Sequence, residues 1–167
     1  MSEHRIVNCT FEKHGEEILS ILNEVIVSST AIYDYEQRTI ADIAKWFQSK
    51  KEGGFPVLGL EAASGELVAF ASYGSFRNWP AYKFTIEHSI YVKKGYRGFG
   101  FGDAILSSVV DDARKNGFHA LIGGIDIENT ASIKFHEKHG FVNKGTLKEV
   151  GYKFNRWLDL GLYQLIL

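Results

Sequence analysis

The sequence has one cysteine, two prolines and no long hydrophobic run among its 167 residues. The single cysteine, Cys9, cannot form an intramolecular disulfide, which excludes a disulfide framework and a multi-thiolate metal site. No apolar stretch reaches the roughly 18 residues that a membrane span needs, and the N-terminus lacks the basic start and apolar centre of a signal peptide. These absences predict a protein of the reducing cytoplasm with no membrane partner.

A strong net charge is also missing. The chain has 19 Lys and Arg against 20 Asp and Glu, a formal charge of −1. Without a basic excess there is no bulk electrostatic reason to expect nucleic acid as a partner. The content of 45% hydrophobic and 23% charged residues is typical of a soluble globular protein and excludes a disordered chain. A chain of this length favours one domain that buries roughly two-thirds of its unfolded surface.

The pattern of apolar residues predicts a mixed order of helices and strands. A strand at residues 5–7 precedes a helix in which apolar residues recur at three- and four-residue steps from 18 to 26. Thr39 is expected to cap a second helix, whose buried stripe would be Ile40, Ile43, Ala44 and Phe47. Further expected elements are strands at 55–62, 67–73 and 82–92, a helix at 104–116, a strand at 121–127, a helix at 130–139 and two strands within 141–167. No linker or repeat divides this order, so residues 1–167 are expected to form one α+β domain.

Glycine is abundant, with 17 residues, and its densest cluster lies between a predicted strand and a predicted helix. There Gly98, Gly100 and Gly102 follow Arg97 at alternate positions. A glycine turn that leads into a helix N-terminus presents backbone N–H groups to an anion and lets a phosphate approach closely. The cluster is neither a Walker loop nor a dinucleotide fingerprint, because no Gly-Lys-Ser/Thr follows and Asp103 replaces the last glycine. It is therefore a candidate pyrophosphate cradle, with an ordinary glycine turn as the alternative.

These residues resemble the acyl-coenzyme A loop of the GNAT superfamily of N-acetyltransferases, whose core reads Arg/Gln-x-x-Gly-x-Gly/Ala. Residues 87–92 before the loop and 129–132 and 135–141 after it are similar to the branch that contains phosphinothricin and methionine sulfone acetyltransferases. The tail resembles that branch at 145–147, 151–153 and 157–159. The resemblance covers most of the chain from about residue 70 onward and, more loosely, the two N-terminal helices.

The resemblance implies a three-layer α+β fold with a splayed mixed sheet of about seven strands, flanked by about four helices. The pantetheine arm of acetyl-CoA would lie between two parting strands and its pyrophosphate on the glycine loop. Phe99 stands where the family often has Lys or Arg, which would leave the phosphates to the backbone and Arg97. The branch also implies a homodimer. The implied cofactor-binding residues are Ile90, Tyr91, Val92, Arg97, Gly98, Phe99, Gly100, Phe101, Gly102, Asn129 and Ser132.

An amine acceptor requires a group that removes a proton. A lysine-like amine with a pKa of ~10.4 is only about 0.04% neutral at pH 7, which corresponds to ~4.6 kcal/mol. Strand alternation places Glu87 on the polar face of the strand at 82–92, with Thr85 and Ser89. Glu87 is therefore the candidate general base. The alternative is a solvated or salt-bridged strand carboxylate, which position and family resemblance disfavour.

Two histidines need separate interpretations. His136 lies at helical spacing from Asn129 and Ser132, so it is the second catalytic candidate, as a base or as an acid toward the departing thiolate. The alternative is a partly buried histidine bonded to a backbone carbonyl. His88 sits in an apolar stripe and is interpreted as a core residue. The remaining histidines show no metal-ligand spacing, so no metal is expected.

Aromatic residues and one guanidinium suggest an amino-acid-like acceptor. Arg77 could bind a carboxylate or phosphinate, while Tyr33, Tyr35 and Trp79 could exclude water from an apolar side chain. The alternative is a surface charge with packing aromatics. Lys153 and Arg156 could also reach an acid group, or they could equally lie in a dimer contact.

The predicted function is transfer of an acetyl group from acetyl-CoA to the α-amine of a small amino acid or analogue by direct attack in a ternary complex, with the N–H near Val92 polarising the thioester carbonyl. The acceptors considered are phosphinothricin, methionine sulfone and methionine sulfoximine. The alternatives are acetylation of a protein or peptide amine and a non-catalytic acyl-CoA-binding module.

Overall fold

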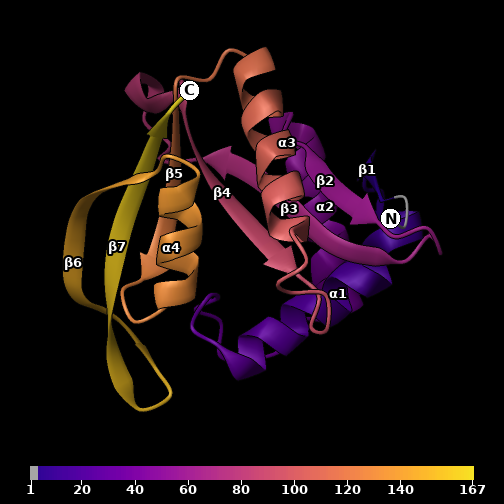
Figure 1. Ribbon diagram of the computed structural model, residues 1–167, viewed down its shortest axis with the longest axis horizontal. Helices are drawn as coiled ribbons and strands as arrows, with labels where there is room; N and C mark the ends of the chain where they lie inside the picture. The colour runs from indigo at the N-terminus through magenta and orange to yellow at the C-terminus, as the bar shows by residue number, and fades with distance from the viewer. Residues whose placement is uncertain (1–3) are drawn as a thin grey trace.

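A computed structural model describes residues 4–167, so the first three residues of the expected domain lie outside the described part of the chain. The elements follow the predicted alternation of helices and strands (Figure 1). They are β1 (Arg5–Asn8), α1 (Phe11–Ser28), α2 (Ile40–Gly53), β2 (Val57–Glu61), β3 (Leu67–Ser75), the 3-10 turn η1 (Pro80–Tyr82), β4 (Thr85–Val92), α3 (Phe101–Lys115), β5 (Ala120–Asp126), α4 (Thr130–Lys138), β6 (Val142–Lys153) and β7 (Arg156–Ile166).

Seven strands form one mixed sheet in the order β1-β2-β3-β4-β5-β7-β6. Only β4 and β5 run parallel, and every other neighbouring pair is antiparallel. The crossover that a parallel pair requires is supplied by α3, which connects β4 to β5. The predicted fold class, a splayed mixed sheet of seven strands with four helices, is confirmed.

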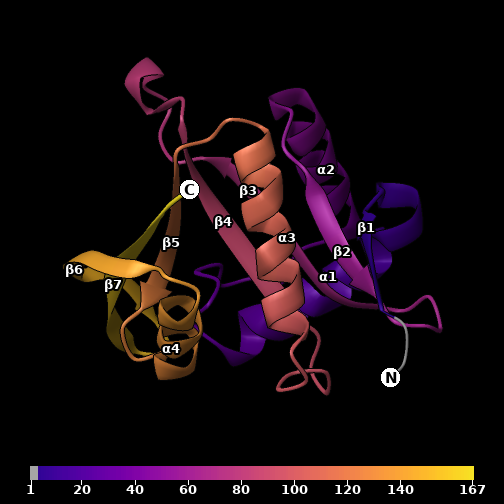
Figure 2. The same ribbon diagram turned by 45° about the horizontal axis from the view of Figure 1, so that its top comes forward.

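Helices cover both faces of the sheet (Figure 2). One core places α1 and α2 on one face, where Ile18, Ile43 and Phe70 are fully buried. The other core places α3 against the opposite face, and α4 lies beside β5 on that side. Leu106 and Val109 of α3 are fully buried there. The fold therefore has three layers, with the sheet in the middle.

Local sequence signals explain how the helices begin. Thr39 caps α2 in a capping box with Asp42, and Gly54 ends that helix in the left-handed conformation. The predicted buried stripe of α2 is correct for Ile43, which has no exposed surface, but wrong for Ile40, which is 37% exposed. Ile40 is the first residue of α2, directly after the cap Thr39.

The starts of two elements differ by three residues from the sequence prediction. The strand expected from residue 82 begins at Thr85, because Pro80 opens a 3-10 turn that Lys83 closes by donating its N–H to the Pro80 carbonyl. The helix expected from residue 104 begins at Phe101, directly after Gly100. Within residues 4–167, no helix combines the length and hydropathy that a membrane crossing requires.

Candidate active site

β4 and β5 separate part-way along their length. They are paired only where residues 85–87 face residues 120–122; beyond that point β4 pairs with β3 and β5 pairs with β7. The Lys93 N–H donates to the Val68 carbonyl of β3 at 2.9 Å. Because alternate residues of a strand direct their backbone groups the same way, the N–H groups of Ile90 and Val92 face the opening instead. Two backbone donors thus line the gap between the strands.

The opening leads to the glycine loop through a cavity of about 560 Å³. Gly98 and Gly100 have φ angles of 85° and 84°, in the left-handed region that L-residues avoid. No atom lies within 4 Å of the position that a Cβ would take at either residue, so backbone conformation rather than crowding requires glycine. α3 starts without a side-chain cap, which leaves the N–H groups of its first turn open to an anion. The loop therefore fits a pyrophosphate.

Most residues predicted to bind the cofactor line this single cavity, namely Ile90, Tyr91, Val92, Arg97, Gly98, Gly100, Gly102, Asn129 and Ser132. Phe99 and Phe101 do not line it, and Phe99 is 70% exposed. Arg97 is held at the cavity edge, where its Nη2 donates to Glu24 Oε2 at 2.8 Å and its Nε to the Val92 carbonyl at 3.1 Å. Glu24 thus offsets part of the charge that Arg97 presents to an anion.

Glu87 lies on the β4 face that carries α1 and α2. The residue keeps exposed surface, but its carboxylate end lies against β5, with one oxygen 3.2 Å from where a Cβ on Gly124 would stand. Burial of the carboxylate among these atoms raises its pKa, and the nearby Arg77 guanidinium partly opposes this shift. A carboxylate with a raised pKa is a stronger base, which suits removal of a proton from an ammonium group.

His88 and His136 lie together on the opposite face. Their side chains come from β4 and α4, and their Nε2 atoms are 3.0 Å apart. His88 Nδ1 lies 2.9 Å from the Ile122 carbonyl, and His136 Nδ1 lies 2.7 Å from the Ser132 carbonyl. Both histidines are buried, and burial lowers the pKa of each imidazole. The two neighbours Glu87 and His88 therefore face different sides of the opening, as strand alternation predicted.

A second cavity, of about 90 Å³, lies at the point where the strands part. Both histidines line it, together with Asn129 and Ser132. Asn129 caps α4 by accepting the Ser132 N–H at 3.1 Å, which directs the first turn of α4 toward the opening. Asp126, also in its wall, accepts from Thr30 and Arg156, each at 2.6 Å.

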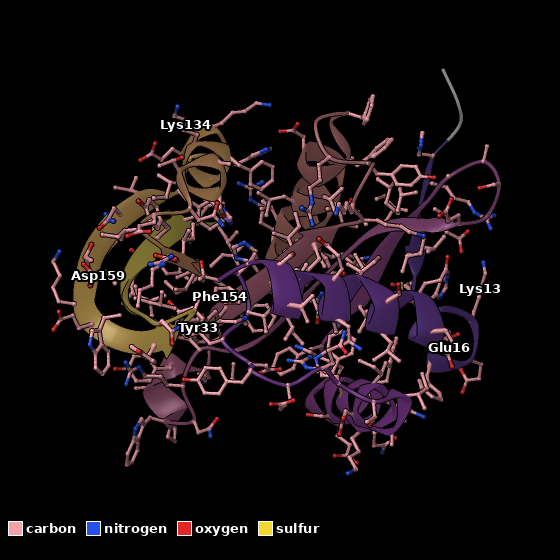
Figure 3. The ribbon with its side chains drawn as sticks, turned by 90° about the horizontal axis from the view of Figure 1, so that it is seen from below. Lys13, Glu16, Tyr33, Lys134, Phe154 and Asp159 are labelled. Atoms are coloured by element: carbon pink, nitrogen blue, oxygen red, sulfur yellow. The ribbon has the colours of Figure 1, made fainter. Side chains whose placement is uncertain are left out.

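The predicted acceptor-binding side chains lie outside these two cavities. Tyr33 packs over Gly151, and Figure 3 shows it beside the β6–β7 hairpin that carries Phe154. The Tyr35 hydroxyl donates to the Tyr152 carbonyl at 2.7 Å. Trp79 is 72% exposed and directly precedes η1, which projects from the end of the sheet where β4 begins (Figure 1). The structure therefore brings together most of the residues predicted to bind the cofactor, whereas the residues predicted to bind the acceptor are spread around the site.

Lys153 and Arg156, the two basic residues considered for binding an acid group, both bind groups of this chain. Lys153 Nζ is buried and donates to the carbonyls of Ile26, Ser29 and Ile32. Arg156 is bound to Asp126 and also lies 3.3 Å from Glu128. Lys153 thus connects the β6–β7 hairpin to the last turn of α1 and to the segment after it. No local sequence signal indicates this role, because the partners are backbone carbonyls.

Cys9 lies apart from the opening. It lines a different cavity with Phe11 and Lys50, and burial, followed by the charge of Glu61, raises the pKa of its thiol to about 12. Among residues 4–167 no group of three or more His, Cys, Asp or Glu side chains is arranged to hold a metal ion.

A mixed sheet opened between two parallel strands, an uncapped helix behind a glycine loop and a carboxylate at the opening define the architecture of an acyl-CoA-dependent acetyltransferase. The model of the acetyltransferase (GNAT) family matches residues 18–141. The chain belongs to this family of N-acetyltransferases.

Individual relatives resemble nearly the whole chain. The L-methionine sulfoximine/L-methionine sulfone acetyltransferase of Pseudomonas aeruginosa is 38% identical over 148 residues, which span 89% of this chain and 86% of that protein. A ribosomal-protein-alanine N-acetyltransferase from Brucella melitensis has a crystal structure with a TM-score of 0.94 and 37% identity, covering 98% of this chain and 99% of that one. A phosphinothricin acetyltransferase from Sinorhizobium meliloti, solved in complex with acetyl-CoA, has a TM-score of 0.93 and 30% identity, covering 98% and 88%.

Proposed function

We propose that the protein transfers the acetyl group of acetyl-CoA to the α-amine of a small amino acid or analogue, of the methionine sulfone, methionine sulfoximine or phosphinothricin type. The observation that carries this proposal is the placement of the Glu87 carboxylate and the free N–H groups of Ile90 and Val92 around one opening. The names of the Pseudomonas aeruginosa and Sinorhizobium meliloti relatives support this class of acceptor.

The residues that line the large cavity fit the parts of acetyl-CoA. The left-handed glycines and the first turn of α3 would hold the pyrophosphate, and the exposed backbone edge of β4 would pair with the pantetheine amides. Bound there, acetyl-CoA supplies an activated acetyl group as a thioester. The Val92 N–H would donate to the thioester carbonyl oxygen as negative charge develops on it.

Glu87 would accept the proton of the acceptor ammonium, directly or through water, and so generate the neutral amine. His136 would serve the second proton transfer, toward the departing sulfur. The two groups lie on opposite faces of the sheet, which suits two separate proton transfers in one direct attack. Cys9 is too remote and too weakly acidic to carry the acetyl group.

A second candidate is acetylation of a protein N-terminus. It is favoured by the similarity to the ribosomal-protein-alanine N-acetyltransferase and by the exposed surface of Glu87. A peptide acceptor needs such an open approach. The two candidates share the same acetyl donor and the same base, and they differ only in the size of the acceptor.

An acceptor screen separates the candidates. The protein is incubated with acetyl-CoA and a panel that contains methionine sulfone, methionine sulfoximine, phosphinothricin, the common amino acids and a peptide that begins with alanine, while thiol release is recorded. We expect turnover with one of the amino acid analogues. Turnover with the peptide alone would reverse the order of the two candidates. Thiol release that none of the acceptors stimulates would contradict both.

We further propose that the protein is a homodimer. The β6–β7 hairpin at the edge of the sheet exposes several large apolar side chains, namely Val142, Leu147, Val150, Tyr152, Phe154 and Trp157. A patch of this kind often marks an interface. Light scattering should give twice the chain mass, and a monomer would contradict this proposal.

A further inference from the structure

Phe99 is a large apolar residue of the glycine loop, and it lies outside both cavities of the opening. It is 70% exposed, and the left-handed Gly98 and Gly100 stand on either side of it. A single exposed phenylalanine is common on protein surfaces, so exposure alone assigns it no role. Its place in the chain distinguishes it, because both neighbouring glycines line the cavity that fits a pyrophosphate.

Other aromatic rings support the ring of Phe99 from the side of the core. It lies 6.2 Å from the ring of Phe101, centroid to centroid, with 33° between the two planes. The Phe101 ring lies 6.1 Å from that of Tyr96 and 4.3 Å from that of His4. Phe101 and Tyr96 both pack against the core around α3. Phe99 is therefore the exposed end of a row of rings that is anchored in the core.

The shape of acetyl-CoA decides which of its parts can reach this ring. Its pyrophosphate joins two arms, a pantetheine arm that ends in the thioester and an adenosine arm that ends in a purine base. The pantetheine arm would run through the cavity between β4 and β5, because the groups that can act on the thioester lie at its inner end. With the pyrophosphate on the loop, the adenosine arm must then leave toward solvent, where Phe99 is exposed.

Stacking would let the loop bind this arm without a basic side chain. An aromatic ring and a purine base attract each other face to face, and the attraction requires no charge. The Arg97 guanidinium, next in the loop, already donates to Glu24 at 2.8 Å and cannot be counted as a free cation. An uncharged contact at Phe99 therefore suits the chemistry of its surroundings.

Phe135 also approaches the loop, but it is less free to stack on a base outside the cavity. One carbon of its ring lies 3.2 Å from where a Cβ on Gly102 would stand. Its ring centroid lies 5.2 Å from that of His136 and 5.0 Å from that of His139. Phe135 is half-buried and lines the large cavity, so it would contact the enclosed part of the donor.

We propose that Phe99 is a stacking platform for the adenine base of acetyl-CoA and holds the end of the donor that the cavity does not enclose. The proposal rests on the proposed function and deepens it, since it assigns a residue to the adenosine arm. The donor is then held by backbone N–H groups at its pyrophosphate and by an uncharged ring at its base.

Calorimetric titration with CoA tests the proposal without any acceptor. Phe99→Leu keeps an apolar side chain but removes the aromatic face, and the backbone of Phe99 is not left-handed, so leucine can adopt it. We expect Phe99→Leu to raise the Kd for CoA about 10-fold and Phe99→Tyr to leave it within about twofold. Phe84→Leu is the matched control, because Phe84 is 54% exposed and lies outside the loop. Its Kd should equal that of the wild type.

Nuclear magnetic resonance detects the contact itself. With CoA bound to the wild type, we expect nuclear Overhauser effects between the adenine H2 or H8 proton and aromatic ring protons, and we expect Phe99→Leu to lose them. Their absence in the wild type, or their persistence in Phe99→Leu, would overturn the proposal. An unchanged Kd in Phe99→Leu, or equal losses in Phe99→Leu and Phe99→Tyr, would also overturn it.

The same measurements separate this proposal from the proposed function. A wild-type protein that does not bind CoA would overturn both. A protein that stacks the adenine on Phe99 but acetylates no acceptor would overturn only the proposed function, whereas one that acetylates an acceptor with an unchanged Kd in Phe99→Leu would overturn only the role of Phe99.

Discussion

The two ends of the opening between β4 and β5 work by different means. At the end where the strands part, the groups that can move protons are side chains, Glu87 on one face and the His88–His136 pair on the other. At the far end, where α3 begins, the groups that can hold phosphates are backbone N–H groups of a glycine loop. Under the proposed function, proton transfer and phosphate binding would therefore use different parts of the opening.

Under the proposed function, this difference explains how a chain with a formal charge of −1 could bind a highly charged donor. Arg97, the basic side chain that lines the cavity, is paired with Glu24. Backbone N–H groups and the positive end of α3 can supply attraction without any side-chain charge. We call the end with Glu87 and the histidine pair the reacting end, and the end with the glycine loop the loop end. We expect substitutions at the reacting end to change kcat and substitutions at the loop end to change the KM for acetyl-CoA.

The largest effect is expected from Glu87→Gln at the reacting end. The amide cannot accept the ammonium proton, so kcat at pH 7 should fall by about 10²- to 10³-fold with the KM for acetyl-CoA unchanged. Activity should recover partly at high pH, where the free amine needs no base. Steady-state rates of thiol release from pH 6 to 10 measure both effects.

Glu16→Gln, on the exposed side of α1 (Figure 3), is the matched control. A variant with wild-type activity at every pH would remove Glu87 from the mechanism.

The acid limb of the wild-type profile should report the same carboxylate. Only ionised Glu87 can accept a proton, so kcat/KM should fall as the pH drops through its pKa. Because burial raises that pKa, the midpoint should lie above the value of about 4.3 for a free glutamate. This limb should disappear in Glu87→Gln, and its persistence there would assign it to another group.

The loop end could be predicted from the sequence because its signal is local. The glycines are contiguous, their spacing is fixed, and the strand before and the helix after them are set by short-range periodicity. Strand alternation likewise sent Glu87 and His88 to opposite faces. For secondary structure and burial, local patterns failed at the ends of elements, as at Ile40 and at the strand expected from residue 82, where a first helical turn and a proline turn intervene.

The pairing of His88 with His136 could not be predicted in this way. The two residues are 48 positions apart, and they meet only because α4 packs beside β5 and Gly123 leaves room for the ring. The same holds for Lys153, which reaches a carbonyl 127 residues away. Such contacts depend on the tertiary arrangement of several elements, and no spacing along the chain encodes them.

At the loop end, an intermediate effect is expected from Gly100→Ala. Its φ of 84° is unfavourable for alanine, so the loop must shift or carry a strain of roughly 1 kcal/mol. The KM for acetyl-CoA should rise about fivefold, because a loss of about 1 kcal/mol in binding corresponds to that factor, while kcat stays near the wild-type value.

Gly65→Ala is the control for this strain. Gly65 has a φ of 85° with no atom near its Cβ position, and it lies in the turn between β2 and β3, away from the cavity. Both variants should lower the Tm by roughly 2–4 °C, and only Gly100→Ala should change the KM. A matching rise of the KM in Gly65→Ala would mean that general destabilisation, and not the loop, weakens binding.

The smallest effect is expected from Cys9→Ala, which tests whether the chemistry is confined to the opening. A thiol with a pKa of about 12 is almost entirely protonated at pH 7, and only a thiolate attacks a thioester efficiently. Cys9 lines a cavity that shares no residue with those of the opening, so an acetyl group attached there could not reach Glu87. We expect kcat within about twofold of the wild type and double-reciprocal plots that intersect, as direct attack in a ternary complex requires. Parallel plots in the wild type, together with inactivity of a Cys9→Ala protein of normal Tm, would instead require an acetyl-cysteine intermediate and a second reacting site.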